Sequence, residues 1–530
     1  MDLEIITAWK QWEQWADEGW SMLPFIIKSK QVKGGLPSSW SKAWEMASPY
    51  SVVLESGKGG RFTYLGLTPA SILKGKDNSA TVLEPMGDLE GKIEEVIKMN
   101  GQPLEMLEQW MAPFTSPRIQ TASLPPFAGG CIGFLGYDVV RSLERLPIVA
   151  QDNPGFPDFL FMRMNEIWIY DHDEDMLYCA QHILTPVGTR EELEIIYSEA
   201  VLRAEEMLGQ WHLLSVTDSE LEDEVTEITD MYADSSGEWP GMTSAFSREQ
   251  FEQAVLDVQE YIRQGDVFQV NLSLRQEAQL KSSPEDIYEW LRKLNPSPYM
   301  GLLRSPGFTL SSASPELLVK LHGDRVSARP IAGTRRRGLT PAEDAAMEAE
   351  LRESDKEIAE HIMLVDLERN DIGRIAAYGS VHVPELMTVE YYSHVMHLVS
   401  QVEGKIAEGK DTYDVIGALF PGGTITGAPK VRTMEIIEEL EPVRRGPYTG
   451  SMGWIDYNGN MELNIIIRTL AVKDGIGYIQ TGAGIVIDSD PYREYRECHN
   501  KAKAVVKAVL CSERQQEYRN TEGAEGGATL

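Results

Sequence analysis

The sequence predicts an α+β fold, and three observations lead to this prediction. Strand-like runs such as residues 50–54 and 167–170 are separated by turn signals such as the glycine-rich residues 57–60. Helical runs, in which apolar residues recur at helical spacing, stand between these strands in no fixed order. This irregular succession differs from the regular strand–helix alternation of a doubly wound parallel sheet. We therefore expect strands and helices that are not organised as repeated βαβ units.

The chain divides into regions of different composition. Its 530 residues indicate more than one domain. Residues 1–215 form an N-terminal region, and the acidic residues 216–243, with the turn-like sequence 234–237, are interpreted as a solvated linker. Residues 244–512 form a denser second half, and the polar residues 513–530 are expected to be a disordered tail. The second half opens with a helix whose apolar positions are Phe251, Val255, Val258 and Ile262.

Composition excludes several classes of protein. The formal net charge of −33 argues against nucleic acid or an anionic membrane as a partner, because both select basic surfaces. No run approaches the roughly 20 apolar residues of a membrane-spanning helix, and the first residues lack the pattern of a signal peptide. We therefore predict a cytoplasmic protein. The cysteines have no metal-like spacing and are expected to be idle thiols: Cys131, Cys179, Cys498 and Cys511.

A glycine-interrupted strand precedes a helix with charged residues on one face. Gly482 and Gly484 interrupt the apolar residues 477–487, and glycine inside a strand often marks the close approach of a ligand. Asp490 and Pro491 then provide an N-cap and a first helical residue. In the following helix, one face carries two carboxylates and an ammonium group: Glu494, Glu497 and Lys501. The simpler interpretation is an exposed salt-bridged stripe, but the adjacent glycines favour a site.

A second helix, over residues 358–371, carries another carboxylate at the edge of its apolar stripe. Ile358, Ile362 and Val365 form the predicted buried stripe, and Glu360 borders it. A carboxylate in this position needs a basic partner or a metal ion, because burying it alone is costly. One or two carboxylates with substrate and water suit Mg²⁺. Glu360 and Glu497 form such a pair only if the fold brings them together, which their spacing does not show.

Further segments are suited to an anion or to acid catalysis. The Gly/Thr-rich residues 420–430 lead into a helix and offer free N–H groups to an anion, although they do not form a Walker A loop and also fit an ordinary tight loop. Glu316 follows an apolar strand. Arg468 lies in the apolar run 465–470, read as a strand, where a guanidinium needs an anion or dense hydrogen bonding. The basic run Arg335–Arg337 is better explained as a solvated surface patch.

Together these segments resemble the chorismate-binding enzymes, a family that comprises the large subunits of anthranilate and aminodeoxychorismate synthases and the isochorismate and salicylate synthases. The resemblance extends from about residue 49 to about residue 510. Its motifs are Pro-Ile-Ala-Gly-Thr-Arg (330–335), the helix over 359–371, Gly-Ala-Pro-Lys (427–430) and the Gly-Ala-Gly sequence 482–484 with residues up to 489. It implies a fold of antiparallel sheets surrounded by helices.

The resemblance also implies roles for individual residues. Glu360 and Glu497 match the ligands of Mg²⁺, the expected cofactor, which would hold the ring carboxylate of the substrate chorismate. Glu316 matches the general acid for the departing C4 hydroxyl, and the other matched catalytic positions are His397, Thr424 and Lys501. The matched substrate-binding positions are Gly333, Thr334, Tyr448, Arg468, Gly482, Ala483 and Gly484. Mg²⁺, Arg468, Lys501 and backbone amides would thus supply positive potential within an acidic protein.

Two details favour the aminodeoxychorismate branch of the family over the anthranilate branch. Asn271 stands where anthranilate synthases usually have valine, and the loop 420–427 is closer in form to the aminodeoxychorismate synthases. Against this, Ala332 occupies the place where many of those enzymes carry a nucleophilic lysine. Residues of a tryptophan-type pocket occur in both branches and do not decide between them: Ser56, Pro298, Tyr299 and Met300. The hydroxylating branches are less well supported, because they usually place a lysine base near the substrate and lack this sequence context. A non-enzymatic scaffold is less well supported because both metal carboxylates are present.

A partner is implied by the source of the amino group. No cysteine in the sequence has the glycine neighbours and downstream histidine and glutamate of a glutaminase nucleophile. We therefore expect a separate glutamine amidotransferase subunit that delivers ammonia to this chain.

Overall fold

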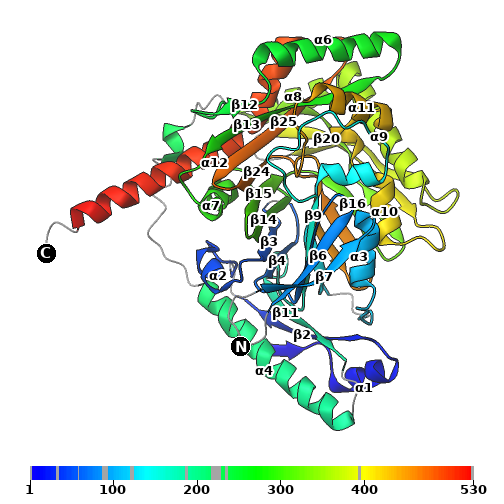
Figure 1. Ribbon diagram of the computed structural model, residues 1–530, viewed down its shortest axis with the longest axis vertical. Helices are drawn as coiled ribbons and strands as arrows, with labels where there is room; N and C mark the ends of the chain where they lie inside the picture. Colours follow the sequence, from blue (N-terminus) through cyan, green and yellow to red (C-terminus); the bar gives the residue numbers. More distant parts are fainter. Residues whose placement is uncertain are drawn as a thin grey trace.

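The computed structural model describes residues 3–31, 35–57, 59–85, 93–119, 124–185, 189–215, 228–232, 237–391 and 395–526, with side chains up to Arg519. Lys58 of the predicted turn, residues 216–227 and 233–236 of the predicted linker, and residues 527–530 of the predicted tail lie outside this set. Two large sheets form the centre of the molecule, and helices cover their outer faces (Figure 1). The predicted α+β class and its antiparallel sheets are confirmed, because every strand pair within the described sheets is antiparallel.

The first sheet has 13 strands drawn from both halves of the chain. Its order is β1 (Leu3–Ile5), β2 (Met22–Lys30), β11 (Met176–Leu184), β10 (Glu166–Asp171), β4 (Phe62–Gly66), β3 (Ser51–Glu55), β14 (Tyr299–Ser305), β15 (Phe308–Ser314), β24 (Thr469–Lys473), β25 (Ile476–Ile485), β13 (Gln269–Gln279) and β12 (Thr243–Ser244). The short strand β21 (Gly427–Ala428) also pairs with β13.

The second sheet has 12 strands and likewise mixes the two halves. Its order is β18 (Ile331–Arg336), β20 (Val395–Lys405), β17 (Arg325–Ala328), β16 (Leu317–His322), β23 (Met461–Asn464), β22 (Ser451–Asp456), β8 (Gly130–Leu135), β9 (Phe159–Met164), β5 (Ser71–Lys76), β6 (Ser79–Pro85) and β7 (Ile93–Asn100). β19 (His382–Tyr391) pairs with β20. The predicted N-terminal region and second half therefore share both sheets and do not fold as separate units.

Both faces of the central strands are buried, which explains their nearly continuous apolar sequences. In β9, Leu160 and Met162 pack between the two sheets, whereas Phe159 and Phe161 pack under the outer helices. This alternation follows from the two-residue period of a strand. The outer face of the second sheet is covered by α3 (Pro103–Met111), α9 (Asp355–Gly373) and α10 (Thr412–Leu419). α11 (Lys430–Leu440) packs on β13 of the first sheet.

The outer face of the first sheet is covered by a second group of helices. They are α1 (Trp9–Asp17), α2 (Ser41–Met46), α4 (Arg190–Leu214), α7 (Pro284–Leu294) and α12 (Pro491–Gly526). The predicted helix around Phe251 is confirmed as α6 (Arg248–Gln264), which packs on β13. The remaining helix is α8 (Pro341–Glu353), with the short 3₁₀ turns η1 (Tyr137–Ser142) and η2 (Gly423–Ile425).

The predicted linker and tail are wrong where the structure describes them. Ile228 and Trp239 are buried in the core beside α12, so these linker residues are not solvated. Residues 513–526 continue α12, which extends away from the sheets towards the C-terminus (Figure 1). Gln515 accepts a hydrogen bond from the Trp290 indole at 3.1 Å, and Glu513 accepts one from the Lys281 amide. Polar contacts with α7 and with the residues before it thus hold a segment that lacks an apolar period.

The helix predicted over 358–371 is confirmed as α9, but its buried face differs from the predicted stripe. Ile362 is 45% exposed, whereas the buried positions are His361, Leu364, Val365, Glu368, Asp371 and Ile372. The inward face of α9 therefore contains a histidine and two acidic residues. The spacing of apolar residues alone would place these three side chains in solvent. His361 is accommodated by a 2.5 Å hydrogen-bond contact between its Nε2 and the Ser400 hydroxyl on β20.

Candidate active site

One cavity of about 510 Å³ gathers nearly all the residues singled out in the sequence. It lies where the ends of β13, β25 and β18 meet α9, α12 and the loops around η2 and Arg468. The predicted residues that line it are Glu316, Gly333, Thr334, Glu360, His397, Thr424, Tyr448, Arg468, Gly482, Gly484, Glu497 and Lys501. These positions span almost 190 residues of sequence, so their meeting is a property of the fold and not of local spacing.

Ala483 is the exception among the predicted binding positions. Its side chain is fully buried with Leu272 and Ile485 on the opposite face of β25. Because side chains alternate along a strand, only its two glycine neighbours face the cavity. The structure therefore corrects Ala483 from a side-chain contact to a spacer between Gly482 and Gly484.

The beginning of α12 places three charged residues at the cavity. Asp490 caps the helix, as predicted, by accepting a hydrogen bond from the Arg493 amide at 2.9 Å. Glu497 and Lys501 form an ion pair of 2.9 Å, and Lys501 also donates to the Gly482 carbonyl at 2.9 Å. Glu494 lines the same cavity, and partial burial raises the pKa of its carboxyl. The predicted salt-bridged stripe exists, and it faces the cavity.

The strand pairing fixes the distance between β25 and β13. Gly482 lies opposite Ser273, and Gly484 lies opposite Asn271. A Cβ atom added at Gly482 would come within 2.3 Å of Asn271 Oδ1 and 2.8 Å of the Tyr448 hydroxyl. The glycine is therefore required because polar groups of β13 and Tyr448 approach the backbone of β25. Asn271 is thus a cavity residue as well as a subfamily marker.

The second predicted metal carboxylate, Glu360, enters from α9. Its Oε1 accepts a hydrogen bond from Gln269 Nε2 at 3.0 Å. Among the described residues, no group of three or more His, Cys, Asp and Glu side chains is arranged to hold a metal ion. Glu360 on α9 and Glu497 on α12 line the same cavity and nevertheless provide the one or two hard oxygen ligands that Mg²⁺ takes when substrate and water complete its shell. The donor set therefore fits Mg²⁺.

Glu316 is the most strongly perturbed carboxyl that faces the cavity. It lies in the loop after β15 and is 8% exposed. Burial raises the pKa of Glu316 to about 7, while Thr424, Lys501 and Arg468 act in the opposite direction by favouring the charged carboxylate. A carboxyl that titrates near neutral pH can hold a proton and release it to a leaving group. This is the property that its predicted role requires.

His397 is held in a neutral state at the opposite wall. Burial lowers the pKa of its imidazole to about 4, and its Nδ1 lies 3.0 Å from Thr334 Oγ1 and 3.2 Å from the Gly333 carbonyl. A hydrogen on Nδ1 satisfies that carbonyl and leaves Nε2 as an acceptor. Gly333 adopts a φ of +65°, which glycine accepts readily, and this bends β18 at the cavity.

Arg468 differs from its prediction. The residue precedes β24 and does not lie within a strand, and its φ is +49°. A left-handed backbone at a non-glycine residue stores strain, and such residues concentrate at functional sites. The bend directs the guanidinium into the cavity, where it lowers the pKa of Glu316.

Several cavity residues were not identified from the sequence as site residues. They are Gln269, Asn271, Pro315, Ile331, Lys356, Glu357, Leu364, Ile425, Ile467, Gln480 and Thr481. The predicted surface patch is consistent with the structure, since Arg335 pairs with Glu350 and Glu357 and Arg337 pairs with Asp344. Glu357 connects this patch to the cavity wall.

The four residues of the tryptophan-type pocket line a second, separate cavity: Ser56, Pro298, Tyr299 and Met300. Its volume of about 30 Å³ has room for little more than one water molecule. All four cysteines are buried, and burial raises the pKa of each thiol, as expected for idle thiols. In the described part of the chain, no helix combines the length and apolar character that crossing a membrane requires.

Comparison with known proteins assigns the family. The sequence model described as chorismate binding enzyme matches residues 50–507. The chain belongs to this family. This chorismate-binding enzyme is 45% identical, over 89% of its length and 94% of the relative, to aminodeoxychorismate synthase component 1 of Bacillus subtilis. It is 41% identical, over 89% of its length and 92% of the relative, to anthranilate synthase component 1 of Acetivibrio thermocellus.

A solved structure supports the same fold. Anthranilate synthase component I from Streptococcus pneumoniae superimposes with a TM-score of 0.68 at 33% identity, covering 84% of this chain and 92% of that chain. The predicted family resemblance is therefore confirmed by sequence and by fold.

Proposed function

We propose that this chorismate-binding enzyme is the large subunit of aminodeoxychorismate synthase, which replaces the C4 hydroxyl of chorismate by an amino group. The observation that carries the proposal is the single cavity in which the buried acid Glu316 faces the cations Arg468 and Lys501. The 45% identity to aminodeoxychorismate synthase component 1 favours this branch. A cytoplasmic location accords with the four buried, unpaired cysteines.

The residues of the cavity suggest how the substrate is held. Chorismate carries two carboxylates, and Arg468 and Lys501 supply the positive charge to bind them within an acidic protein. The glycines of β25 let the backbone approach the ligand, and the Tyr448 hydroxyl stands beside Gly482. In this proposal the cavity walls orient the ring so that the C4 hydroxyl lies by Glu316.

The departing hydroxyl needs a proton. The elevated pKa of Glu316 keeps a fraction of the carboxyl protonated at neutral pH, and the proton passes from its carboxyl oxygen to the leaving oxygen. Glu360 and Glu497 would hold Mg²⁺. When bound there, the ion would neutralise the ring carboxylate and withdraw electron density from the ring. Neutral His397 offers an acceptor nitrogen on the wall formed by β18 and β20.

The same proposal includes a glutamine amidotransferase partner. Because all four cysteines are buried thiols with raised pKa values, this chain offers no thiolate to attack glutamine. We expect the purified chain to use ammonium salts and to fail with glutamine until the partner is added. Turnover of glutamine by the purified chain alone would contradict this part of the proposal.

Product analysis tests the proposed reaction. Purified chain, chorismate, Mg²⁺ and ammonium should yield 4-amino-4-deoxychorismate, which mass spectrometry detects and a separate lyase converts to 4-aminobenzoate for folate. The second candidate is anthranilate synthase, favoured by the 41% identity to anthranilate synthase component 1. Formation of anthranilate, visible by its fluorescence, would establish that candidate and reject ours. Isochorismate would indicate water as the nucleophile and reject both aminations.

A further inference from the structure

A buried arginine behind the cavity contacts three of the segments that form its wall. Arg445 is 3% exposed, lies between α11 and β22, and is not among the residues that line the active-site cavity. Its two carbonyl acceptors are Asn271 O at 2.7 Å and Ile425 O at 2.8 Å. Its Nη1 also approaches the Thr449 hydroxyl at 3.3 Å. These three acceptors belong to β13, to η2 and to the turn that follows Tyr448.

Glu441 completes the coordination of the guanidinium. It accepts hydrogen bonds from Arg445 Nε at 3.0 Å and from Nη2 at 2.7 Å. Five hydrogen bonds therefore use all five N–H groups of the arginine. The same Glu441 carboxylate accepts the Ser273 amide at 2.8 Å, and Ser273 lies opposite Gly482. The pair thus holds β13 at two backbone groups, the Asn271 carbonyl and the Ser273 amide.

The segments that Arg445 contacts carry groups with chemical roles. Ile425 follows Thr424, whose hydroxyl lowers the pKa of Glu316. Thr449 follows Tyr448, whose ring lies 5.6 Å from the guanidinium carbon of Arg445. Thr449 has a φ of +60°, an unfavourable conformation for a β-branched residue, and its hydroxyl is held by Arg445. A displacement of the guanidinium would therefore be transmitted to Thr424 and Tyr448.

We propose that Arg445 is a positioning residue that sets the places of Thr424, Tyr448 and β13 around the reacting atoms, and this inference rests on the proposed function of the cavity. Only arginine suits the position, because lysine has three donors on one nitrogen and cannot reach acceptors in a planar fork. Arg445 itself touches no substrate and acts through the residues it holds.

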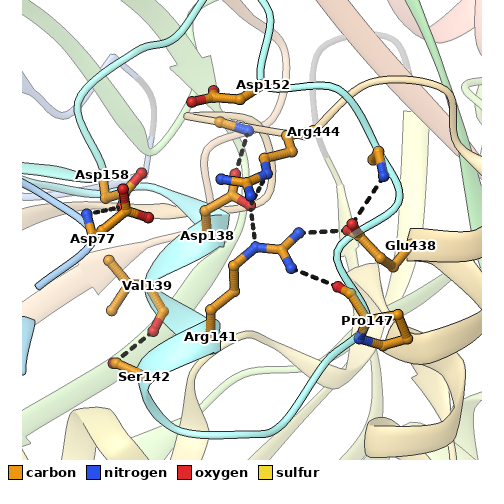
Figure 2. A network of polar contacts seen from close by, with 12 residues as sticks. Asp77, Asp138, Val139, Arg141, Ser142, Pro147, Asp152, Asp158, Glu438 and Arg444 are labelled. Atoms are coloured by element: carbon orange, nitrogen blue, oxygen red, sulfur yellow. Dashed lines mark hydrogen bonds and ion pairs between the residues drawn. The ribbon is translucent and has the colours of Figure 1, made fainter.

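A neighbouring arginine provides the matched control. Arg141 forms a similar fork with a side chain that is 16% exposed, and Figure 2 shows its three partners. They are Asp138 at 2.9 Å, Glu438 at 2.5 Å and the Pro147 carbonyl at 2.8 Å. None of these partners lines the active-site cavity. Asp138 also accepts the Gly446 amide at 3.1 Å, so Arg141 is linked to the Arg445 segment through this carboxylate. Arg141→Lys should therefore cost stability as Arg445→Lys does, while every hydrogen bond of Arg445 to the cavity wall is kept.

The experiment compares both variants in chorismate consumption, whatever product forms. We expect Arg445→Lys to lower kcat by about 10- to 100-fold with a smaller change in KM, because small misplacements of reacting groups have effects of this size. The alkaline limb of the kcat–pH profile should move to higher pH, since a displaced Thr424 hydroxyl no longer lowers the pKa of Glu316. Arg141→Lys should keep the wild-type profile. Equal kcat and pH profiles in both variants would overturn the proposal.

Two further measurements separate positioning from mere stabilisation. In a Thr424→Val background, Arg445→Lys should cause no additional shift of the pH limb, and an unchanged shift would contradict action through Thr424. A crystal structure of Arg445→Lys gives a readout that does not depend on the reaction. We expect displaced Thr424 and Tyr448 side chains, and wild-type positions would reject the inference. If Arg445→Lys does not fold, the neutral double variant Arg445→Gln/Glu441→Gln replaces it in the same measurements.

The two proposals fail in different ways. A product other than 4-amino-4-deoxychorismate rejects the proposed function and leaves the Arg445 comparison intact, because chorismate consumption and the crystal structures are judged against the wild-type chain. A wild-type-like Arg445→Lys variant rejects the positioning role while the product assignment stands.

Discussion

Lys501 and Glu497, one turn apart at the start of α12, form an ion pair of 2.9 Å at the wall of the cavity. Both side chains are about half exposed, so the pair contributes little to stability by itself. The pair lines the same cavity as Glu360 and Arg468, so its two charged groups can also bind ligands there. The carboxylate can turn to a divalent cation while the ammonium remains on the Gly482 carbonyl and turns to a substrate anion.

The first prediction is metal dependence, which the proposed Mg²⁺ site requires. We expect chelation to abolish chorismate turnover and added Mg²⁺ to restore it. Glu497→Gln should lower turnover by at least about 100-fold while the chain stays folded, because a bound metal ion supplies several kcal/mol of charge stabilisation. Asp366→Asn is the control, since Asp366 lies on α9 with Glu360 but is 60% exposed and pairs with Arg369. Full activity in a chelator would disprove the metal site.

The raised pKa of Glu316 predicts a pH dependence. As a general acid it must be protonated, so activity should fall as the pH rises through about 7, the pKa to which burial raises its carboxyl. Glu316→Gln keeps the shape but removes the acidic proton, and kcat should drop by about 10²- to 10⁴-fold. The remaining activity should lose this alkaline limb. A limb that persists in Glu316→Gln would assign the titration to another group.

Gly482 offers a test of the close approach between β25 and β13. A methyl group there would meet Asn271 Oδ1 at 2.3 Å, the Tyr448 hydroxyl at 2.8 Å and the Leu272 carbonyl at 3.0 Å. We expect Gly482→Ala to lower kcat/KM by about 100-fold through displaced cavity walls. Gly373→Ala serves as the control because a methyl group meets nothing within 4 Å there. Similar kinetics for the two variants would show that Gly482 does not shape the site.

The sequence predicted those parts of the site that depend on residues close together in the chain. Asp490 and Pro491 define the start of α12 through capping. Gly482 and Gly484 mark the positions where other groups come close to the backbone of β25. These rules involve neighbours within a few residues, and the structure follows them.

The errors arise where distant contacts override local pattern. The predicted burial of Ile362 is wrong because Ser400 on β20 provides a hydrogen-bond partner for His361. This contact lets a polar side chain occupy the inward face of α9. Arg468 was read as part of a strand, yet its φ of +49° interrupts the apolar run. The coordination of Arg445 could not be read from the sequence, because its acceptors Asn271 and Ile425 are brought to it only by the pairing of distant segments.

The final prediction concerns Ala332, which lines the cavity at the bend of β18 and is 9% exposed. Alanine cannot be a nucleophile, so ammonia reaches C4 without a covalent intermediate at this position, or another amine substitutes. Ala332→Lys places an amine at the cavity wall, and we expect a covalent adduct by intact-mass analysis or a changed product distribution. Burial should favour the neutral, nucleophilic form of this amine.

Ser327→Lys is the control for Ala332→Lys, because it adds the same amine to a strand of the same sheet at a position outside the cavity. Lys356→Ala tests whether another amine in the cavity acts as the nucleophile in place of a lysine at position 332. Lys356 and Lys501 are the lysines among the described residues that line the cavity. Two results together would assign covalent catalysis to Lys356. Lys356→Ala would lose activity, and intact-mass analysis at short reaction times would show a covalent adduct on the wild-type chain. An Ala332→Lys variant with unchanged product, rate and mass would show that residue 332 does not face the ring, and the placement of Pro330 to Thr334 against the substrate would then be wrong.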